Sequence, residues 1–176
     1  YYAGLLAAGV RVFEYRGGRY DYNLVFLDPL DGREQRLLTP ACQTDEYSST
    51  AIDPDSGFLY DETTGALFLV YDSSPGGIQR IDPGSHSTTW QTLEEGWFSF
   101  SSDPFPGMLG TDSLYFSTEG RLLAVDLETG RLRTLVMEED YDPLPLALSG
   151  DTLLVRMRWM RGSERFELRG LNAASG

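Results

Sequence analysis

The sequence predicts an all-β fold in which about four similar antiparallel units follow one another along the chain. Strand–turn–strand segments recur at a nearly constant spacing, which is the first reason for this prediction. The 176 residues include 19 Gly and 9 Pro, a content typical of many short strands joined by tight turns. No window of eleven or more residues shows helical periodicity. Hydrophobic residues make up 41% of the chain, so we expect a packed core.

Each repeat is centred on a strand that leads into a Gly-bearing turn. The four copies occupy residues 24–28, 77–82, 122–126 and 166–170, with the turn glycines Gly32, Gly84, Gly130 and Gly176. Superposition places Asp28, Asp82, Asp126 and Gly170 in one column, at spacings of 54, 44 and 44 residues. An Asp at a strand end can accept hydrogen bonds from the backbone downstream, and Gly takes a positive φ without steric cost. The repeat therefore has a chemical basis in its turns.

Further strands are expected on both sides of each copy. Apolar strands precede the four copies at residues 10–13, 66–70, 113–116 and 152–155, and outer strands follow the first three at 35–38, 88–91 and 132–135. An innermost strand is expected at residues 2–8, 48–52, 97–102 and 145–149, where the residues are small and apolar enough to crowd a central axis. The four units then span about residues 1–39, 47–93, 97–137 and 143–176, and the last lacks an outer strand.

One stretch carries a resemblance to known proteins. Residues 125–132, preceded by Leu114-Tyr115-Phe116, resemble the repeat unit of bacterial β-propellers of the quinoprotein-like and TolB-like kind. The resemblance implies four-stranded blades around a central channel, with residues 1–176 as a single propeller segment. A four-bladed ring closed by a strand from elsewhere and a fragment of a six- to eight-bladed ring are both open. We favour the fragment, because four blades are the small limit of the architecture.

Charge and residue types exclude several functions. The formal net charge of −13 argues against a nucleic-acid partner, which requires a basic face. Cys42 is the single cysteine and His86 the single histidine, so neither an intrachain disulfide nor a typical zinc site can form. His86 lies in a predicted turn and is expected to be a solvated residue rather than a catalytic base. We expect no catalytic residues, no metal and no cofactor.

Acid pairs, apolar stretches and the start of the chain bear on metal binding and location. Calcium binding by Asp53 with Asp55, or by Asp140 with Asp142, is not favoured, because Asp-rich turns are common for backbone reasons. No stretch approaches the roughly 18 apolar residues of a membrane span. The start at Tyr1 has no Met and no basic region, which would fit a removed signal or lipoprotein leader. We therefore expect an extracytoplasmic location.

Adjacent acids followed by an aromatic residue recur in the connections between units. We call these residues the acidic–aromatic face: Asp45, Glu46, Tyr47, Glu94, Glu95, Trp97, Glu138, Glu139, Asp140 and Tyr141. In a propeller these connections share one side with the loops between second and third strands, here residues 19–22 and 158–161. Amphipathic rings are enriched at binding sites, and a carboxylate rim attracts cationic partners. The alternative is that the acids only solvate the loops and the rings fill the blade junctions.

The sequence therefore predicts a non-catalytic ligand- or protein-binding propeller domain of an extracytoplasmic bacterial protein, which binds through the acidic–aromatic face. The alternative is the substrate-gating propeller portion of a hydrolase or quinoprotein enzyme whose catalytic residues lie outside this segment. A purely structural role in an assembly is the third interpretation.

Overall fold

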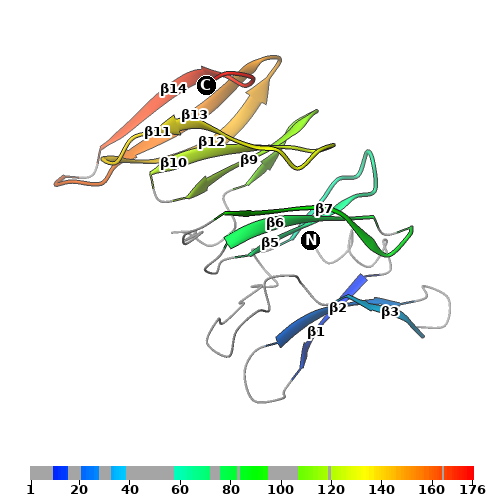
Figure 1. Cartoon of the computed structure of the whole chain (residues 1–176). Helices are drawn as coiled ribbons and strands as arrows, with labels where there is room; N and C mark the ends of the chain where they lie inside the picture. Colours follow the sequence, from blue (N-terminus) through cyan, green and yellow to red (C-terminus); the bar gives the residue numbers. More distant parts are fainter. Residues whose placement is uncertain are drawn as a thin grey trace. The chain divides into compact units, whose positions relative to one another are not determined.

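The protein is all-β, as predicted. The computed structural model describes residues 10–15, 21–27, 33–38, 58–71, 76–82, 84–94, 107–118, 120–163 and 165–176. Within these ranges the chain forms strands β1 to β14 and no helix (Figure 1). The chain divides into two compact units, Tyr1–Phe98 and Ser99–Gly176. In each unit two antiparallel sheets follow one another, and within every sheet the strand order is the chain order.

The first unit contains a three-stranded and a four-stranded meander. The first comprises β1 (Val10–Tyr15), β2 (Asp21–Leu27) and β3 (Glu34–Leu38), and the second comprises β4 (Phe58–Tyr60), β5 (Leu67–Tyr71), β6 (Gly76–Asp82) and β7 (Ser87–Glu94). Leu67 pairs with Ile81 on one face of the second sheet, and Phe68 lies on the other face. All three side chains are fully buried, so this sheet is covered on both faces.

The second unit contains a four-stranded and a three-stranded meander. The first comprises β8 (Met108–Leu109), β9 (Ser113–Thr118), β10 (Arg121–Asp126) and β11 (Leu132–Met137), and the second comprises β12 (Tyr141–Ser149), β13 (Thr152–Trp159) and β14 (Phe166–Asn172). The repeat strands predicted from the sequence, their preceding strands and their outer strands all coincide with observed strands in the two units. Strand periodicity and turn residues were therefore sufficient to locate them.

The innermost strands were predicted less well. Residues 145–149 lie in β12, as predicted, but β12 begins earlier, at Tyr141. The predicted strands at residues 2–8, 48–52 and 97–102 lie outside the described residues. The strand that pairs with β5 is β4, and the strand that pairs with β9 is β8, so both begin later in the chain than predicted. Close hairpin turns, such as the one from Asp61 to Gly65, favour these local pairings over more distant ones.

The repeated turn has the predicted chemistry with a corrected alignment. Asp126 Oδ1 accepts hydrogen bonds from the backbone N–H of Glu128 at 3.1 Å and of Thr129 at 2.7 Å. In the last sheet Asn172 Oδ1 is the corresponding acceptor, with hydrogen bonds from two backbone N–H groups at 2.9 and 3.0 Å. The counterpart of Asp126 is thus Asn172 and not Gly170, because β14 continues two residues beyond Gly170. The predicted turn at Asp28 lies outside the described residues.

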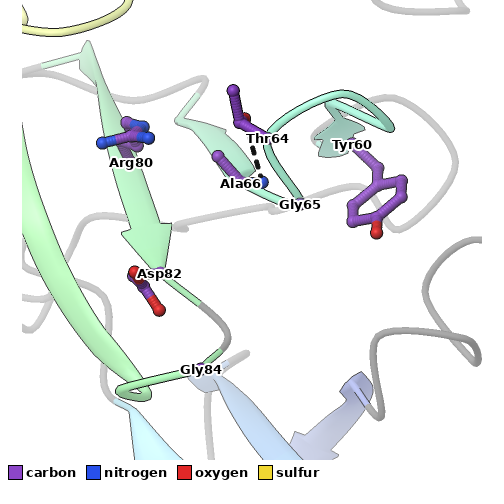
Figure 2. A pocket seen from close by; sticks show the side chains of 7 residues that line it. All are labelled: Tyr60, Thr64, Gly65, Ala66, Arg80, Asp82 and Gly84. Atoms are coloured by element: carbon purple, nitrogen blue, oxygen red, sulfur yellow. Dashed lines mark hydrogen bonds between the residues drawn. The ribbon is translucent and has the colours of Figure 1, made fainter.

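The left-handed residue of the turn also differs from the prediction in one case. After Asp82, whose Oδ1 accepts from the Ser85 N–H at 2.8 Å, the positive φ of 52° occurs at His86 and not at Gly84. In these four turns the residue with positive φ lies four positions after the acceptor residue: Gly65 after Asp61, His86 after Asp82, Gly130 after Asp126 and Gly176 after Asn172. The Asp61 turn, in which the Ala66 N–H also donates to Thr64 Oγ1 at 3.3 Å (Figure 2), was missed from the sequence.

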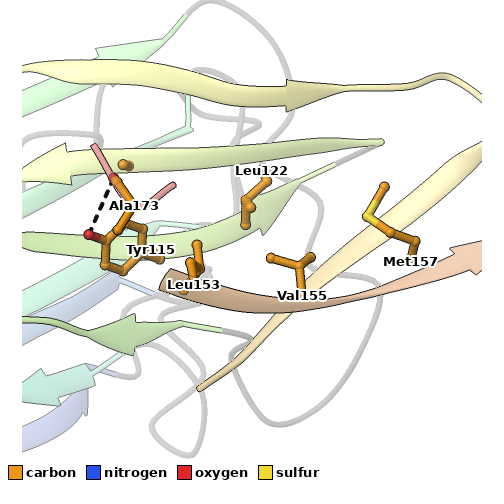
Figure 3. Close-up of a cluster of buried hydrophobic side chains, with 7 residues drawn as sticks. Tyr115, Leu122, Leu153, Val155, Met157 and Ala173 are labelled. Atoms are coloured by element: carbon orange, nitrogen blue, oxygen red, sulfur yellow. Dashed lines mark hydrogen bonds between the residues drawn. The ribbon is translucent and has the colours of Figure 1, made fainter. Parts of the chain in front are cut away.

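The two sheets of the second unit pack face to face. Figure 3 shows the buried cluster between them: Tyr115, Leu122 and Ala124 from β9 and β10, Leu153, Val155 and Met157 from β13, and Ala173. Burial of a large aliphatic side chain stabilises the fold by about 1.5–3 kcal/mol, so this cluster is the main cohesive contact between the sheets. Tyr115 also donates a hydrogen bond from its hydroxyl to the Ala173 carbonyl at 3.5 Å.

The two sheets of this unit differ in how they are covered. Leu114, Phe116, Leu123 and Val125 form the face of β9 and β10 that points away from the cluster, and they are fully buried. The corresponding face of the last sheet is open, since Leu168 in β14 is 66% exposed. Among the residues that the structure describes there is no helix that could cross a membrane.

Candidate binding site

Three connections make up the acidic–aromatic face, and the structure describes the third of them in full. Asp45, Glu46, Tyr47, Glu95 and Trp97 lie outside the described residues, and Glu94 is the last residue of β7, whose side chain is not described. Glu138, Glu139, Asp140 and Tyr141 are described in full and join β11 to β12. Residues 53–57, one candidate for calcium, also lie outside the described part.

Three connections meet at one edge of the second unit. The Glu138 N–H donates to the Gly120 carbonyl, between β9 and β10, at 3.1 Å. The Met160 N–H, in the loop between β13 and β14, donates to the Asp140 carbonyl at 2.8 Å. The connection between sheets therefore lies beside the loops between second and third strands, as the sequence predicted for these residues. Two boundaries were wrong. Arg158 and Trp159 belong to β13, so that loop begins at Met160, and Asp21 and Tyr22 of the other predicted loop belong to β2.

The close approach at Gly120 depends on the absence of a side chain. Its φ is +76°, and a Cβ atom there would lie 3.1 Å from the Glu138 carbonyl oxygen and 3.3 Å from the Tyr141 carbonyl oxygen. A larger residue would push the connection away from the β9–β10 turn. Glycine at this position therefore fixes the path of the chain from Glu138 to Tyr141.

The acids of this connection are paired with arginines. Arg169 in β14 donates from Nη1 to Glu138 Oε1 at 2.5 Å and from Nη2 to Glu167 Oε2 at 3.0 Å. Arg161 Nε lies 2.5 Å from Asp140 Oδ1. The rim of like charge expected from the sequence is thus, in this connection, a network of opposite charges. Glu139 is exposed beside it.

Asp140 and Asp142, the second calcium candidate, are engaged by different arginines. Arg158 donates from Nη2 to Asp142 Oδ2 at 2.9 Å, whereas Asp140 faces Arg161. Across the part of the chain that the structure describes, no three His, Cys, Asp or Glu side chains are grouped so that they could hold a metal ion. The two carboxylates serve to fix the ends of β12 and β13 to each other.

Two aromatic rings form the apolar part of the site. Tyr141 and Trp159 are directly opposite each other on β12 and β13, with ring centroids 5.0 Å apart and an interplanar angle of 71°. The guanidinium carbon of Arg169 lies 5.1 Å from the Tyr141 ring centroid, a cation–π contact. These rings lie on the same face of the sheet as Val155 and Met157, so the site continues the buried cluster to the loop edge.

The Tyr141 hydroxyl is hydrogen-bonded to the network. It donates to Glu167 Oε1 at 3.0 Å, and this hydrogen bond raises the pKa of Tyr141, because the ionised phenol could not donate it. The hydrogen bonds from Arg169, and then that from Tyr141, lower the pKa of Glu167. A general acid at neutral pH needs the opposite shift. The hydrogen bonds hold Glu167 in its charged form beside Arg169 and Tyr141.

The partners from β14 were not found from the sequence. The sequence predicts a strand that contains Glu167 and Arg169, but nothing in the sequence fixes the register of this strand against β13. In the structure Glu167 is opposite Met157 and Arg169 is opposite Val155, which places both on the inner face. The alternation of Glu167 and Arg169 with Leu168 was the available signal, because a strand sends alternate side chains to opposite faces.

Comparison with known proteins does not assign the chain to a family. No protein-family model and no curated protein matches the chain. The resemblance to propeller repeats therefore stays a prediction that depends on the residues quoted for it.

Proposed function

We propose that this chain is a non-catalytic binding domain of an extracytoplasmic protein, built from four propeller blades. Four antiparallel meanders in series, each with strands in chain order, support the blade interpretation. The observation that carries the binding role is the meeting of three connections at one edge, seen in the hydrogen bonds from Glu138 to Gly120 and from Met160 to Asp140. Separate connections that converge on one edge form a continuous surface for recognition.

The chemistry of this edge favours a protein partner. Met137 is 71% exposed and Met160 is 53% exposed, and they flank a network held by Arg169 around Tyr141 and Trp159. Methionine, arginine and aromatic residues are enriched in the cores of protein interfaces, and methionine adapts its shape to a partner. Glu167 and Arg169 hold the Tyr141 ring, and Trp159 packs against it, so these rings lose little side-chain entropy on binding.

A site-specific photo-crosslinking experiment tests the proposal. A photoreactive residue replaces Met160 in one variant and Arg131, in the turn at the opposite edge of the same unit, in the control variant. Both positions are exposed, so both variants are expected to fold. The proposal expects one defined protein adduct in cells from position 160 and none from position 131. The same adduct from both positions, or none from position 160, would refute it.

The charge preference of the partner is tested separately. The acids Asp45, Glu46, Glu94, Glu95, Glu138 and Glu139 are replaced by their amides. If the partner is cationic, these substitutions abolish its binding. In the described connection Glu138 is already paired with Arg169, so Glu139 is the acid there that remains exposed to attract a cation. Unchanged binding by the amide variant would discard the cationic partner.

A further inference from the structure

A pocket of about 340 Å³ lies at one edge of the four-stranded sheet of the first unit (Figure 2). The turn between β4 and β5 and the turn between β6 and β7 form its walls. It is lined by Tyr60, Thr64, Gly65, Ala66, Arg80, Asp82 and Gly84. Its size is that of sites for small molecules, which begin at about 300 Å³.

The pocket holds two opposite charges that do not neutralise each other by contact. Arg80 and Asp82 are two residues apart on β6 and therefore lie on the same face, with Cα atoms roughly 7 Å apart. They form no ion pair: Asp82 Oδ1 accepts from the Ser85 N–H, and Arg80 Nη1 reaches only Thr89 Oγ1, at 3.4 Å. The hydrogen bond from Ser85 lowers the pKa of Asp82 most, and the charge of Arg80 lowers it further.

Arg80 retains a hydrogen-bond donor for which the described residues provide no acceptor. Its Nε is buried and has no partner. Because this Nε has almost no accessible surface, it cannot itself contact a ligand. The terminal nitrogens, of which Nη1 makes the 3.4 Å contact with Thr89, are the groups that a carboxylate would bind, and guanidinium groups are suited to binding a carboxylate through two parallel hydrogen bonds. Arg80 is also the one Arg or Lys residue between positions 40 and 120, a stretch that contains thirteen acids. An arginine placed there attracts an anionic group to a surface that otherwise repels it.

The remaining polar groups of the pocket differ in what they can still bind. The Thr64 hydroxyl is used within its own turn, where it donates to Asp61 Oδ2 and accepts from the Ala66 N–H. The Tyr60 hydroxyl lies beside Gly65, whose Cβ position is 3.9 Å from it. Gly65, Ala66 and Gly84 add no polar side chain to the lining.

We propose that this pocket binds a small zwitterion of the free α-amino acid class, with its carboxylate on Arg80 and its ammonium group on Asp82. An anion without a positive charge would be attracted by Arg80 but repelled by Asp82. A cation without a negative charge would be attracted by Asp82 but repelled by Arg80. A molecule that carries both charges satisfies both side chains. The site is independent of the acidic–aromatic face, which lies in other residues.

Chemical-shift titration of the full chain with L-alanine and L-leucine tests this assignment. Saturable shifts are expected in the amides of residues 60–66, 80–82 and 84–86. Acetate and methylammonium, which each carry one of the two charges, are expected to bind about tenfold more weakly or worse, a loss of about 1.4 kcal/mol. Binding of acetate or inorganic phosphate as tight as that of the amino acids would overturn the zwitterion, and absence of saturable shifts would overturn the site.

Two substitutions separate binding from folding. Arg80→Gln removes the proposed carboxylate contact and is expected to weaken amino-acid binding by about tenfold or more. Asp82→Asn keeps the side-chain oxygen that accepts the hydrogen bond from Ser85, as Asn172 does in its turn. It removes the negative charge that is proposed to bind the ammonium group. Arg131→Gln, an exposed arginine in the turn between β10 and β11, is the control and should bind normally. Equal binding by the Arg80 and Arg131 variants would refute the role of Arg80.

Discussion

Replacing Asp126 by alanine removes the side chain that closes the turn between β10 and β11. Asp126 Oδ1 accepts hydrogen bonds from the Thr129 N–H and the Thr129 hydroxyl, both at 2.7 Å, and from the Glu128 N–H at 3.1 Å. A hydrogen bond of this kind contributes about 0.5–1.5 kcal/mol net, and solvent exposure of the turn reduces each contribution toward the lower value. We therefore expect Asp126→Ala to lower the free energy of unfolding by about 1–2 kcal/mol, as for loss of a helix cap.

The loss should depend on pH in a defined direction. The hydrogen bonds from Thr129 hold the pKa of Asp126 below its ordinary value of 3.8. Because the folded pKa is the lower one, the charge stabilises the fold fully above the unfolded pKa, and this contribution is lost as the pH falls through the folded pKa. The difference between the wild type and Asp126→Ala should therefore shrink below about pH 4.

Asp126→Asn is the matched control. The amide oxygen can accept the same hydrogen bonds, as Asn172 does in the last sheet, but it carries no charge. This variant should be destabilised less than the alanine variant, and its stability should not fall with the titration of residue 126.

Urea unfolding at pH 7 and pH 3.5 measures these effects. With a dependence of about 1–3 kcal/mol per molar urea, a loss of 1–2 kcal/mol moves the midpoint by about 0.5–1 M. Hydrogen exchange of the Thr129 amide reports the local opening of the turn. An alanine variant as stable as the wild type at pH 7, or a stability gap that is unchanged at pH 3.5, would show that the turn does not depend on the ionised Asp126.

Three further predictions test the core, a strained turn and the charged network. Leu122→Ala in the buried cluster should cost about 2–5 kcal/mol in thermal or urea unfolding, whereas Leu168→Ala, at a position 66% exposed, should change stability by less than about 0.5 kcal/mol; equal effects would contradict the packing described. His86→Gly should stabilise the first unit by about 1 kcal/mol, because His86 has a φ of 52° that glycine adopts without strain, and a loss of stability would mean that its side chain contributes more than the strain costs. Glu167→Ala should lower the pKa of Tyr141 toward 10, measured by NMR of a labelled tyrosine ring, and an unchanged pKa would exclude the hydrogen bond between them.

The strands could be predicted because their determinants are local. Residues 113–116 and 122–126 form two apolar runs separated by a short polar segment, and they become β9 and β10 as a hairpin. The exact turn positions were harder, since His86 adopts a conformation that sequence reasoning assigned to Gly84. A non-glycine residue takes a positive φ only where the surrounding chain imposes it, and that constraint is not visible in the local sequence.

The candidate site could be predicted only in its local part. The acids and Tyr141 were identified because they follow one another in the chain, and Met160 was placed beside them from the order of strands in a blade. Their partner Arg169 is separated from Glu138 by 31 residues, and their contact depends on the pairing of β13 with β14. Since a shift of one residue in that pairing would turn Arg169 to the opposite face, the ion pairs could not be inferred without the register.

The meander topology also explains why the two proposed sites can be tested separately. In a sheet of consecutive hairpins, successive connections lie alternately at the two ends of the strands. The pocket beside Arg80 lies between the first and third connections of its sheet, whereas Met160 lies in the second connection of its own sheet, between β13 and β14. Loss of amino-acid binding in Arg80→Gln should therefore leave crosslinking from position 160 intact. If one substitution abolished both, the two effects would have a common cause in folding, and neither site would be supported by its own variant.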